Sequence, residues 1–189
     1  MTWNAFHRRG DVLRAVVDAA DRRLDGVLPL DVPGARECFS DDVDLIGALS
    51  LKWHARLSGN IERALGTEPM GLESAVARAW HTTAQQMPGV RLVIDRAMEH
   101  PTSEQMGVAM GRARRAELVR LAQAAGLAND SSDLAARAGE RVEQQARVGL
   151  TPEREQAAQR TDQRTDQRAV MRVSDRASFV RRIKAVLAA

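Results

Sequence analysis

The residues best suited to chemistry are two Trp-His dipeptides that lie 27 positions apart in the sequence. Trp53-His54 and Trp80-His81 each fall within a stretch that has the pattern of an amphipathic helix. Two neighbouring indoles could line a pocket with imidazoles at its mouth. Successive residues of a helix point about 100° apart, however, so a buried tryptophan turns its neighbour elsewhere. We interpret both tryptophans mainly as core residues, and we name Trp53 and Trp80 as the lining of any pocket formed here.

The histidines do not form a recognisable metal-binding pattern. The sequence contains no HExxH or HxxxH, so no single helix presents a zinc-binding pair. His7 with Asp11, and His100 with Glu104, have a four-residue spacing that occurs in carboxylate-bridged di-iron bundles. A glycine weakens the helix in the first pair and a proline interrupts the second. We predict no metal site and no cofactor.

No nucleophile is accompanied by the groups that would activate it. Cys38 is the only cysteine, which excludes an intrachain disulfide and fits a reducing compartment. It precedes a predicted helix, whose dipole would favour a thiolate, but the sequence identifies no base beside it. Gly-rich phosphate loops and the GxSxG motif are absent from the sequence. We therefore predict no catalytic residue, and the interpretation leans towards a non-enzymatic protein.

Six helical segments would position these residues. Apolar side chains recur every three or four positions, and glycine, proline or capping residues separate the segments. We predict helices over residues 2–25, 41–65, 71–87, 89–99, 102–125 and 133–148. Residues 1–150 contain no clear alternation typical of a β-strand. The predicted fold class is all-α: a helical bundle of about five to six helices with a polar linker and a C-terminal basic amphipathic helix.

Three local features accompany this prediction. A capping box is expected to begin the fifth helix at Thr102. Gly107 and Gly111 form a GxxxG pattern, which we interpret as a close crossing of two helices. The apolar stripes of the first and last helices place Leu24 and Leu134 on buried faces.

The segment over residues 133–147 is a partial match to a helix-turn-helix. Leu134, Ala138 and Gly139 suit its first helix and turn, but Glu140 and Gln145 occupy positions that are usually apolar. A polar group buried there without a partner would cost about 1–3 kcal/mol. We therefore predict one continuous helix over this segment.

Charge divides the chain near residue 150. Residues 1–150 carry 19 basic and 20 acidic side chains, whereas residues 151–189 carry nine basic and five acidic ones. We predict a helical bundle over 1–150 and a separate region over 151–189. Residues 153–168 include a repeated TDQR and only two apolar side chains, so this stretch is expected to be a solvated helix or a linker.

The last segment is the candidate partner-binding element. Its apolar residues fall on one face of a helix: Phe179, Val180, Ile183, Val186 and Leu187. Three cations lie away from that face and form a basic patch: Arg181, Arg182 and Lys184. A helix of about four turns is marginal alone in water, so the stripe should bind a surface. We expect a protein partner or a second copy of the chain.

Composition limits the function class. The chain has 189 residues, of which 44% are apolar, and it contains no apolar run long enough to span a bilayer. We expect a cytoplasmic protein with no membrane partner. The predicted function is a non-enzymatic interaction or regulatory protein that acts through a protein partner or self-association. Two alternatives stay open: a nucleic-acid-associated regulator that uses the basic tail, and a small-ligand or metal-binding bundle.

Substitutions in the tail distinguish apolar from electrostatic binding. Changing Phe179, Ile183 and Leu187 together to Ser should leave helicity nearly intact but abolish self-association or partner capture, measured by sedimentation and co-purification. Each of these side chains contributes roughly 1.5–3 kcal/mol when buried, before ordering costs. If Arg181→Glu with Arg182→Glu abolishes binding while the triple change does not, the contact is electrostatic. Binding that weakens steeply with salt would then indicate nucleic acid.

Overall fold

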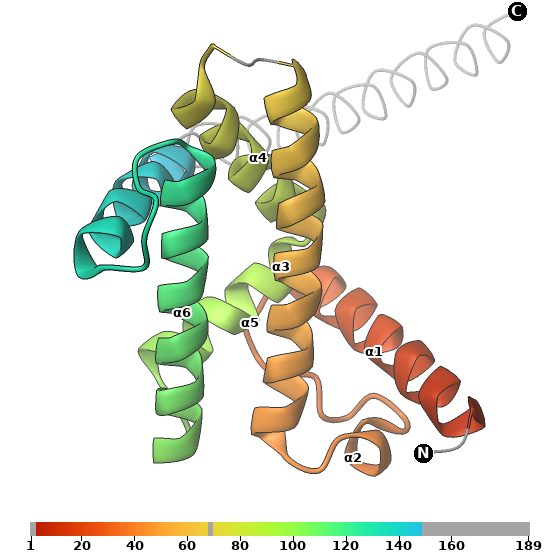
Figure 1. The fold of residues 1–189 in the computed structure, drawn as a ribbon. Coiled ribbons are helices and arrows are strands. Elements are labelled where there is room, and N and C mark those ends of the chain that lie inside the picture. Colours follow the sequence, from red (N-terminus) through yellow and green to blue (C-terminus); the bar gives the residue numbers. More distant parts are fainter. Residues whose placement is uncertain (1–2, 68–69, 149–189) are drawn as a thin grey trace, which may run out of the picture. The chain divides into compact units, whose positions relative to one another are not determined.

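The computed structural model describes residues 3–67 and 70–148 of the chain. This part contains seven helices and no strand, so the all-α class is confirmed (Figure 1). The helices are α1 (Trp3–Arg23), α2 (Ala35–Cys38), α3 (Asp42–Thr67), α4 (Leu72–Gln86), α5 (Pro88–Glu99), α6 (Glu104–Ala124) and a seventh over residues 133–148. Six of them correspond to predicted segments, whereas the single turn α2 falls in a stretch without helical periodicity. None of the described helices is long and apolar enough to cross a membrane.

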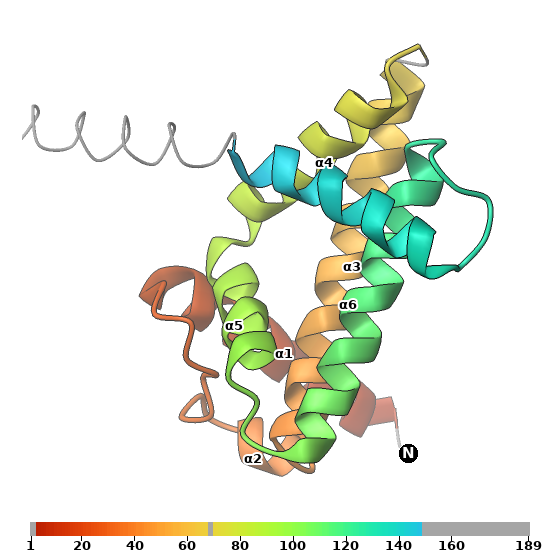
Figure 2. The same cartoon turned by 90° about the vertical axis from the view of Figure 1, so that its left-hand side faces the viewer.

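Helix α3 is the central element of the packing. It contacts α4, α5 and α6, and it runs side by side with α6 in both views (Figures 1 and 2). Its inward face carries an apolar residue every three or four positions, as the periodicity predicts. The fully buried side chains of largest volume come from several of these helices and include Leu45, Leu49, Trp53, Leu57, Trp80 and Leu121.

Helix α1 packs mainly against α5 and touches α3 at few positions. Near its start, the Arg9 guanidinium binds both carboxylate oxygens of Asp44, at 2.6 and 3.2 Å, and stacks 4.1 Å from the centre of the Phe39 ring. Near its end, Asp21 Oδ1 accepts hydrogen bonds from the backbone amides of Gly89 and Val90, at 2.8 and 3.2 Å. These amides are the otherwise unpaired donors that begin α5. Helix α1 is thus attached at both ends.

Two glycines allow helix backbones to touch. A Cβ atom added at Gly89 of α5 would lie 1.9 Å from the carbonyl oxygen of Ala20 in α1. A Cβ added at Gly139, in the helix over 133–148, would lie 1.8 Å from the carbonyl oxygen of Leu118 in α6. The helix over 133–148 is continuous through Gly139, as predicted in preference to a helix-turn-helix.

The GxxxG pattern does not mark a helix crossing, so that interpretation is wrong. A Cβ added at Gly111 would meet nothing within 4 Å, and one at Gly107 would meet only the ring of Pro101, at 3.6 Å. Both glycines line a cleft of about 550 Å³ between α5 and α6. A close crossing needs a backbone opposite the glycine, and the pattern within one helix does not show whether a second helix lies there.

Three local predictions need correction. Ser103, not Thr102, caps α6: its side chain accepts from the Met106 amide at 3.1 Å, and its extended backbone suits that role. Leu24 is 50% exposed because α1 ends at Arg23 and Leu24 itself takes a positive φ of 54°. Leu134 is 73% exposed, and Ala135 takes its place on the buried face, whereas Ala138 and Val142 of the same predicted stripe are buried.

An alanine substitution tests the backbone contact at Gly139. We expect Gly139→Ala to lower the free energy of unfolding by at least about 1–3 kcal/mol, because the methyl group would overlap a carbonyl that cannot move aside. Gly47→Ala is the matched control in α3, where an added Cβ meets nothing within 4 Å. That change should stabilise the protein by about 0.5–1 kcal/mol through helix propensity. Urea unfolding measures both, and equal effects would contradict the crossing.

Candidate functional site

Trp53 and Trp80 lie together in the core. Both are fully buried, and their rings meet edge to face with centroids 5.7 Å apart. Each indole N–H donates to the carboxylate of Glu117, at 3.2 Å from Trp53 and 3.0 Å from Trp80. The two histidines beside them differ. His54 reaches Glu117 as Trp53 does, contrary to the expectation that it turns elsewhere, whereas His81 lies 3.3 Å from the carbonyl oxygen of Ala146.

Glu117 is the buried charge on which four side chains converge. Besides the two indoles, His54 Nε2 lies 3.2 Å from its carboxylate, and Arg91 donates to both oxygens at 3.3 and 3.4 Å. Burial by itself raises the pKa of Glu117. The hydrogen bond with His54, the charge of Arg91 and the hydrogen bond from Trp80 outweigh it and lower the pKa to about 2.

Arg91 connects this carboxylate to a second acid. Its other terminal nitrogen binds Asp95 Oδ1 at 2.7 Å, one turn further along α5. Its guanidinium also lies 4.9 Å from the centre of the Trp53 ring, a distance at which a cation is attracted to the π face. Arg91 is thus almost completely enclosed by opposite charge and aromatic surface.

Asp95 continues the network to the helix over 133–148. Both of its oxygens accept from Arg147, at 2.7 and 3.0 Å, and the same arginine stacks 4.9 Å from the Trp80 ring centre. Arg147 also binds the fully buried Glu143 at 2.9 Å, and Arg114 of α6 pairs with that glutamate. Alternating charges therefore join α5, α6 and the last described helix.

The Glu117–His54 pair has the residue types of an acid–base couple but an unsuitable environment for proton transfer. Both carboxylate oxygens already accept hydrogen bonds, and a pKa of about 2 makes Glu117 a weak base at neutral pH. We assign this cluster to the positioning of helices. The signal in the sequence was an acid on the buried stripe of α6, seven residues after Met110 and four before Leu121.

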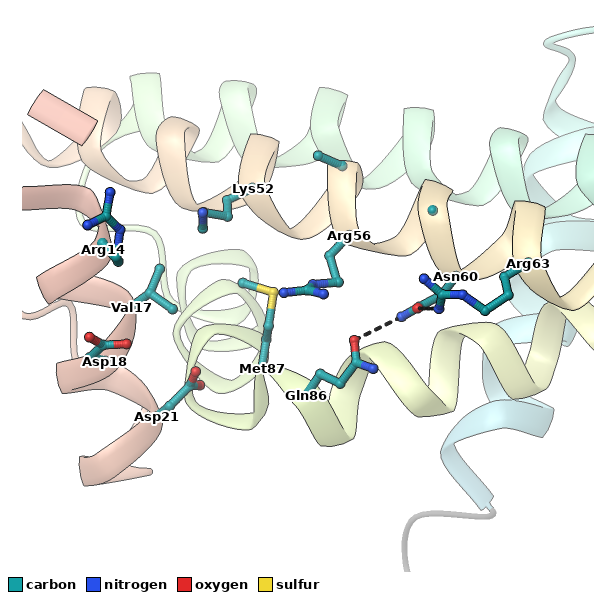
Figure 3. Close-up of a pocket in the computed structure, with 12 residues that line it drawn as sticks. Arg14, Val17, Asp18, Asp21, Lys52, Arg56, Asn60, Arg63, Gln86 and Met87 are labelled. Atoms are coloured by element: carbon teal, nitrogen blue, oxygen red, sulfur yellow. Dashed lines mark hydrogen bonds between the residues drawn. The ribbon is translucent and has the colours of Figure 1, made fainter. Parts of the chain in front are cut away.

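Accessible charged side chains gather instead in a cleft of about 640 Å³ between α1 and α3 (Figure 3). Gln86 and Met87, where α4 meets α5, form its floor. The α1 wall consists of Arg14, Val17, Asp18 and Asp21, and the α3 wall consists of Lys52, Ala55, Arg56, Gly59, Asn60 and Arg63. The lining carries four cations and two carboxylates, so positive charge is in excess.

The α3 wall presents a row of cations. Lys52, Arg56 and Arg63 are spaced so that all three lie on one face of the helix. Arg63 donates to Asn60 Oδ1 at 2.8 Å, and the buried Asn60 is itself held by Thr83 and Gln86, at 2.9 and 3.1 Å. Within the described residues, Lys52 and Arg56 form no hydrogen bond or ion pair.

The α1 wall carries the acids. Asp18 is exposed and has no basic partner in the described part of the chain. Asp21 is half-buried, and this burial raises its pKa although the amides of Val90 and Gly89 favour the charged form. Arg14 pairs with Asp11 at 3.2 Å in a highly exposed contact, which contributes little to its placement.

Sequence reasoning did not find this cleft, although part of its signal was present. Lys52 and Arg56 are four residues apart on one helix, and neither has an acid three or four positions away. Two neighbouring cations without an acid on the same helix indicate a positively charged surface, whose charge another group could neutralise. That Asp18 and Asp21 face them from α1 follows only from the packing (Figure 3).

The other candidate residues are scattered. Cys38 ends α2 and is half-buried, and His100 lies at the end of α5, far along the chain from His7 in α1. Among the described residues, no three His, Cys, Asp or Glu side chains are grouped closely enough to hold a metal ion. The predicted partner-binding stripe and the basic patch fall within 179–187, outside the described residues.

Comparison of the chain with models of protein families, with curated proteins and with solved structures gives no match.

The low pKa of Glu117 makes the stability of the fold depend on pH. The folded-state pKa of about 2 lies below the usual value of 4.5, so the unfolded chain binds this proton more readily. The stabilisation is fully present above about pH 5 and is lost as the pH falls towards 2, by on the order of 3 kcal/mol. Glu117→Gln should lower stability at pH 7 and make the decline between pH 5 and 3 shallower in urea unfolding.

The exposed Glu140 provides the control for this experiment. Glu140→Gln should leave both the stability at pH 7 and the acid-induced decline close to those of the unsubstituted protein. If Glu117→Gln shows the same decline as this control, the buried carboxylate is not a source of the pH dependence.

Proposed function

We propose that this protein is a non-enzymatic regulatory binding protein that takes a small organic anion into the cleft between α1 and α3. The observation that carries the proposal is the pair of unpartnered cations, Lys52 and Arg56, in the cleft wall. An anion would supply an opposite charge in direct contact, because no described side chain forms an ion pair with either cation. In this proposal the helical bundle serves as the scaffold that holds the two walls.

The size and lining of the cleft support a small ligand. Its volume of about 640 Å³ falls within the range of roughly 300–1,000 Å³ that is typical of small-molecule sites. Asn60 and Gln86 add fixed amide groups beside the cations, and their mutual hydrogen bond of 3.1 Å holds them in place. A polynucleotide is less well matched, because a polyanion along the cleft would place phosphates beside Asp18 and Asp21, whereas a small anion can lie against α3 alone.

The protein-partner part of the proposal rests on the sequence. The apolar stripe that contains Phe179, Ile183 and Leu187 has the spacing of a helix that docks into a groove. A regulatory protein needs one surface that binds the ligand and another that binds the partner. The cleft and this stripe are the candidates for those two roles.

A nucleic-acid-associated regulator is the second candidate function. The basic patch of Arg181, Arg182 and Lys184 favours it, because cations clustered beside an amphipathic stripe can contact phosphates. The two candidates differ in which basic residues they need: the cleft cations for a small anion, and the tail cations for a polynucleotide.

Neutralising the cleft cations tests the main proposal. We expect calorimetric titration with a panel of pyrophosphate, citrate and adenosine monophosphate to detect binding of at least one probe by the full chain. Lys52→Gln with Arg56→Gln should weaken that binding at least about tenfold, since a hydrogen bond to a charged group contributes about 1.5–3 kcal/mol. Binding of the probe should also weaken as the salt concentration rises.

The matched control is Arg112→Gln with Arg141→Gln, which removes two exposed cations from other helices. It changes the net charge equally and should leave binding unchanged. Equal losses in the two double variants would show that net charge alone attracts the probe. The absence of binding by every probe would overturn the proposal.

A further inference from the structure

We infer that the ligand of the α1–α3 cleft is dipolar: a small organic anion that also carries an amino group. This inference rests on the proposed function and adds a cationic group to the ligand. It comes from the opposite charges of the two walls, with Lys52 and Arg56 on α3 and Asp18 and Asp21 on α1 (Figure 3).

The α3 wall specifies the anionic end of the ligand. Of its three cations, Arg63 is engaged by Asn60 at 2.8 Å, whereas Lys52 and Arg56 have no partner within the described residues. They lie one helical turn apart and both line the cleft. A carboxylate or phosphate placed between them would accept from both side chains at once.

The α1 wall specifies the cationic end. Asp18 and Asp21 are three residues apart on one helix face, which places their Cβ atoms about 5–6 Å from each other. Their charges repel: Asp18 contributes to the raised pKa of Asp21, after burial. Asp21 cannot turn away, because its Oδ1 caps α5 through two backbone amides. An ammonium group beside Asp18 and Asp21 would relieve this repulsion.

The neighbouring cation on α1 does not already fill this role. Arg14 lies one turn before Asp18, yet its ion pair is with Asp11, at 3.2 Å, on the other side. Asp18 has no basic partner among the described residues. The cleft thus contains both an uncompensated anion and uncompensated cations, held apart on different helices.

A small strip of apolar surface lies in the cleft beside the amide of Gln86. Val17 and Met87 line the cleft, and both side chains are almost fully buried, so they form a fixed surface. A short hydrocarbon segment that joins an amine to an acid suits this strip. Amino acids and phosphorylated amines share this chemistry, whereas a purely anionic ligand would leave Asp18 and Asp21 unneutralised.

Two matched ligand pairs test the inference in the full chain. L-Glutamate is compared with glutarate, and phosphoethanolamine with ethyl phosphate; each pair differs in the amino group, and the two pairs distinguish a carboxylate from a phosphate. We expect the amino-bearing member of at least one pair to bind at least tenfold more tightly by calorimetry. Asp18→Asn should remove that preference and leave binding of the amine-free member intact or stronger. Glu140→Gln, at an exposed site elsewhere, should retain the preference.

The outcomes separate this inference from the proposed function. If the amine-free member of each pair binds as tightly as its partner, or Asp18→Asn leaves a preference unchanged, the dipolar ligand is wrong while the anion site stands. If neither these ligands nor the anion panel binds, both proposals fall. Binding that weakens at least tenfold in Lys52→Gln with Arg56→Gln, with helicity retained, supports the shared site.

Discussion

A carboxylate buried in a protein interior must be surrounded by donors, and Glu117 imposes this requirement on the helices around it. Leaving one charge uncompensated in such a place costs several kcal/mol, roughly 3–5 when a partner is removed. The donors come from α3, α4 and α5 and converge on α6. Each of these helices must therefore be placed so that one particular side chain lies within hydrogen-bonding distance of Glu117. Apolar contact alone would allow each helix to slide or rotate, whereas hydrogen bonds to a single carboxylate do not.

Helix α1 is held in place by contacts outside this network. The charges continue from Arg91 through Asp95 and Arg147 to Glu143, so they connect the central helices to the last described one. Among the contacts described for these charges, none involves a side chain of α1. Helix α1 is instead attached near its start by Arg9 and near its end by Asp21. The stretch between these attachments is left to form a wall that faces α3.

Local periodicity was sufficient to predict the six longer helices but not the single turn α2, because apolar spacing, caps and breakers all act over a few residues. Periodicity could not show that Glu117 is buried and hydrogen-bonded. An acid within an apolar stripe looks like a break in the stripe until its donors on distant helices are known. The cleft depends on the angle between α1 and α3, which is set by contacts between residues distant in the sequence, 35 positions apart for Arg9 with Asp44 and 68 for Asp21 with Gly89. For the same reason the crossing glycines, Gly89 and Gly139, were indistinguishable from Gly107 and Gly111.

The two crossing glycines also influence how the sequence can diverge. Most core positions exchange one apolar residue for another at modest cost, but any side chain at Gly89 or Gly139 would meet a backbone carbonyl. Glu117 and its donors are also difficult to substitute one at a time, because the loss of one partner weakens the hydrogen bonding of the others. A distant relative would therefore keep a sparse set of positions, two glycines with a Trp–Trp–Arg–Glu quartet, while the surrounding sequence drifts. That set is a more durable marker of shared ancestry than overall identity.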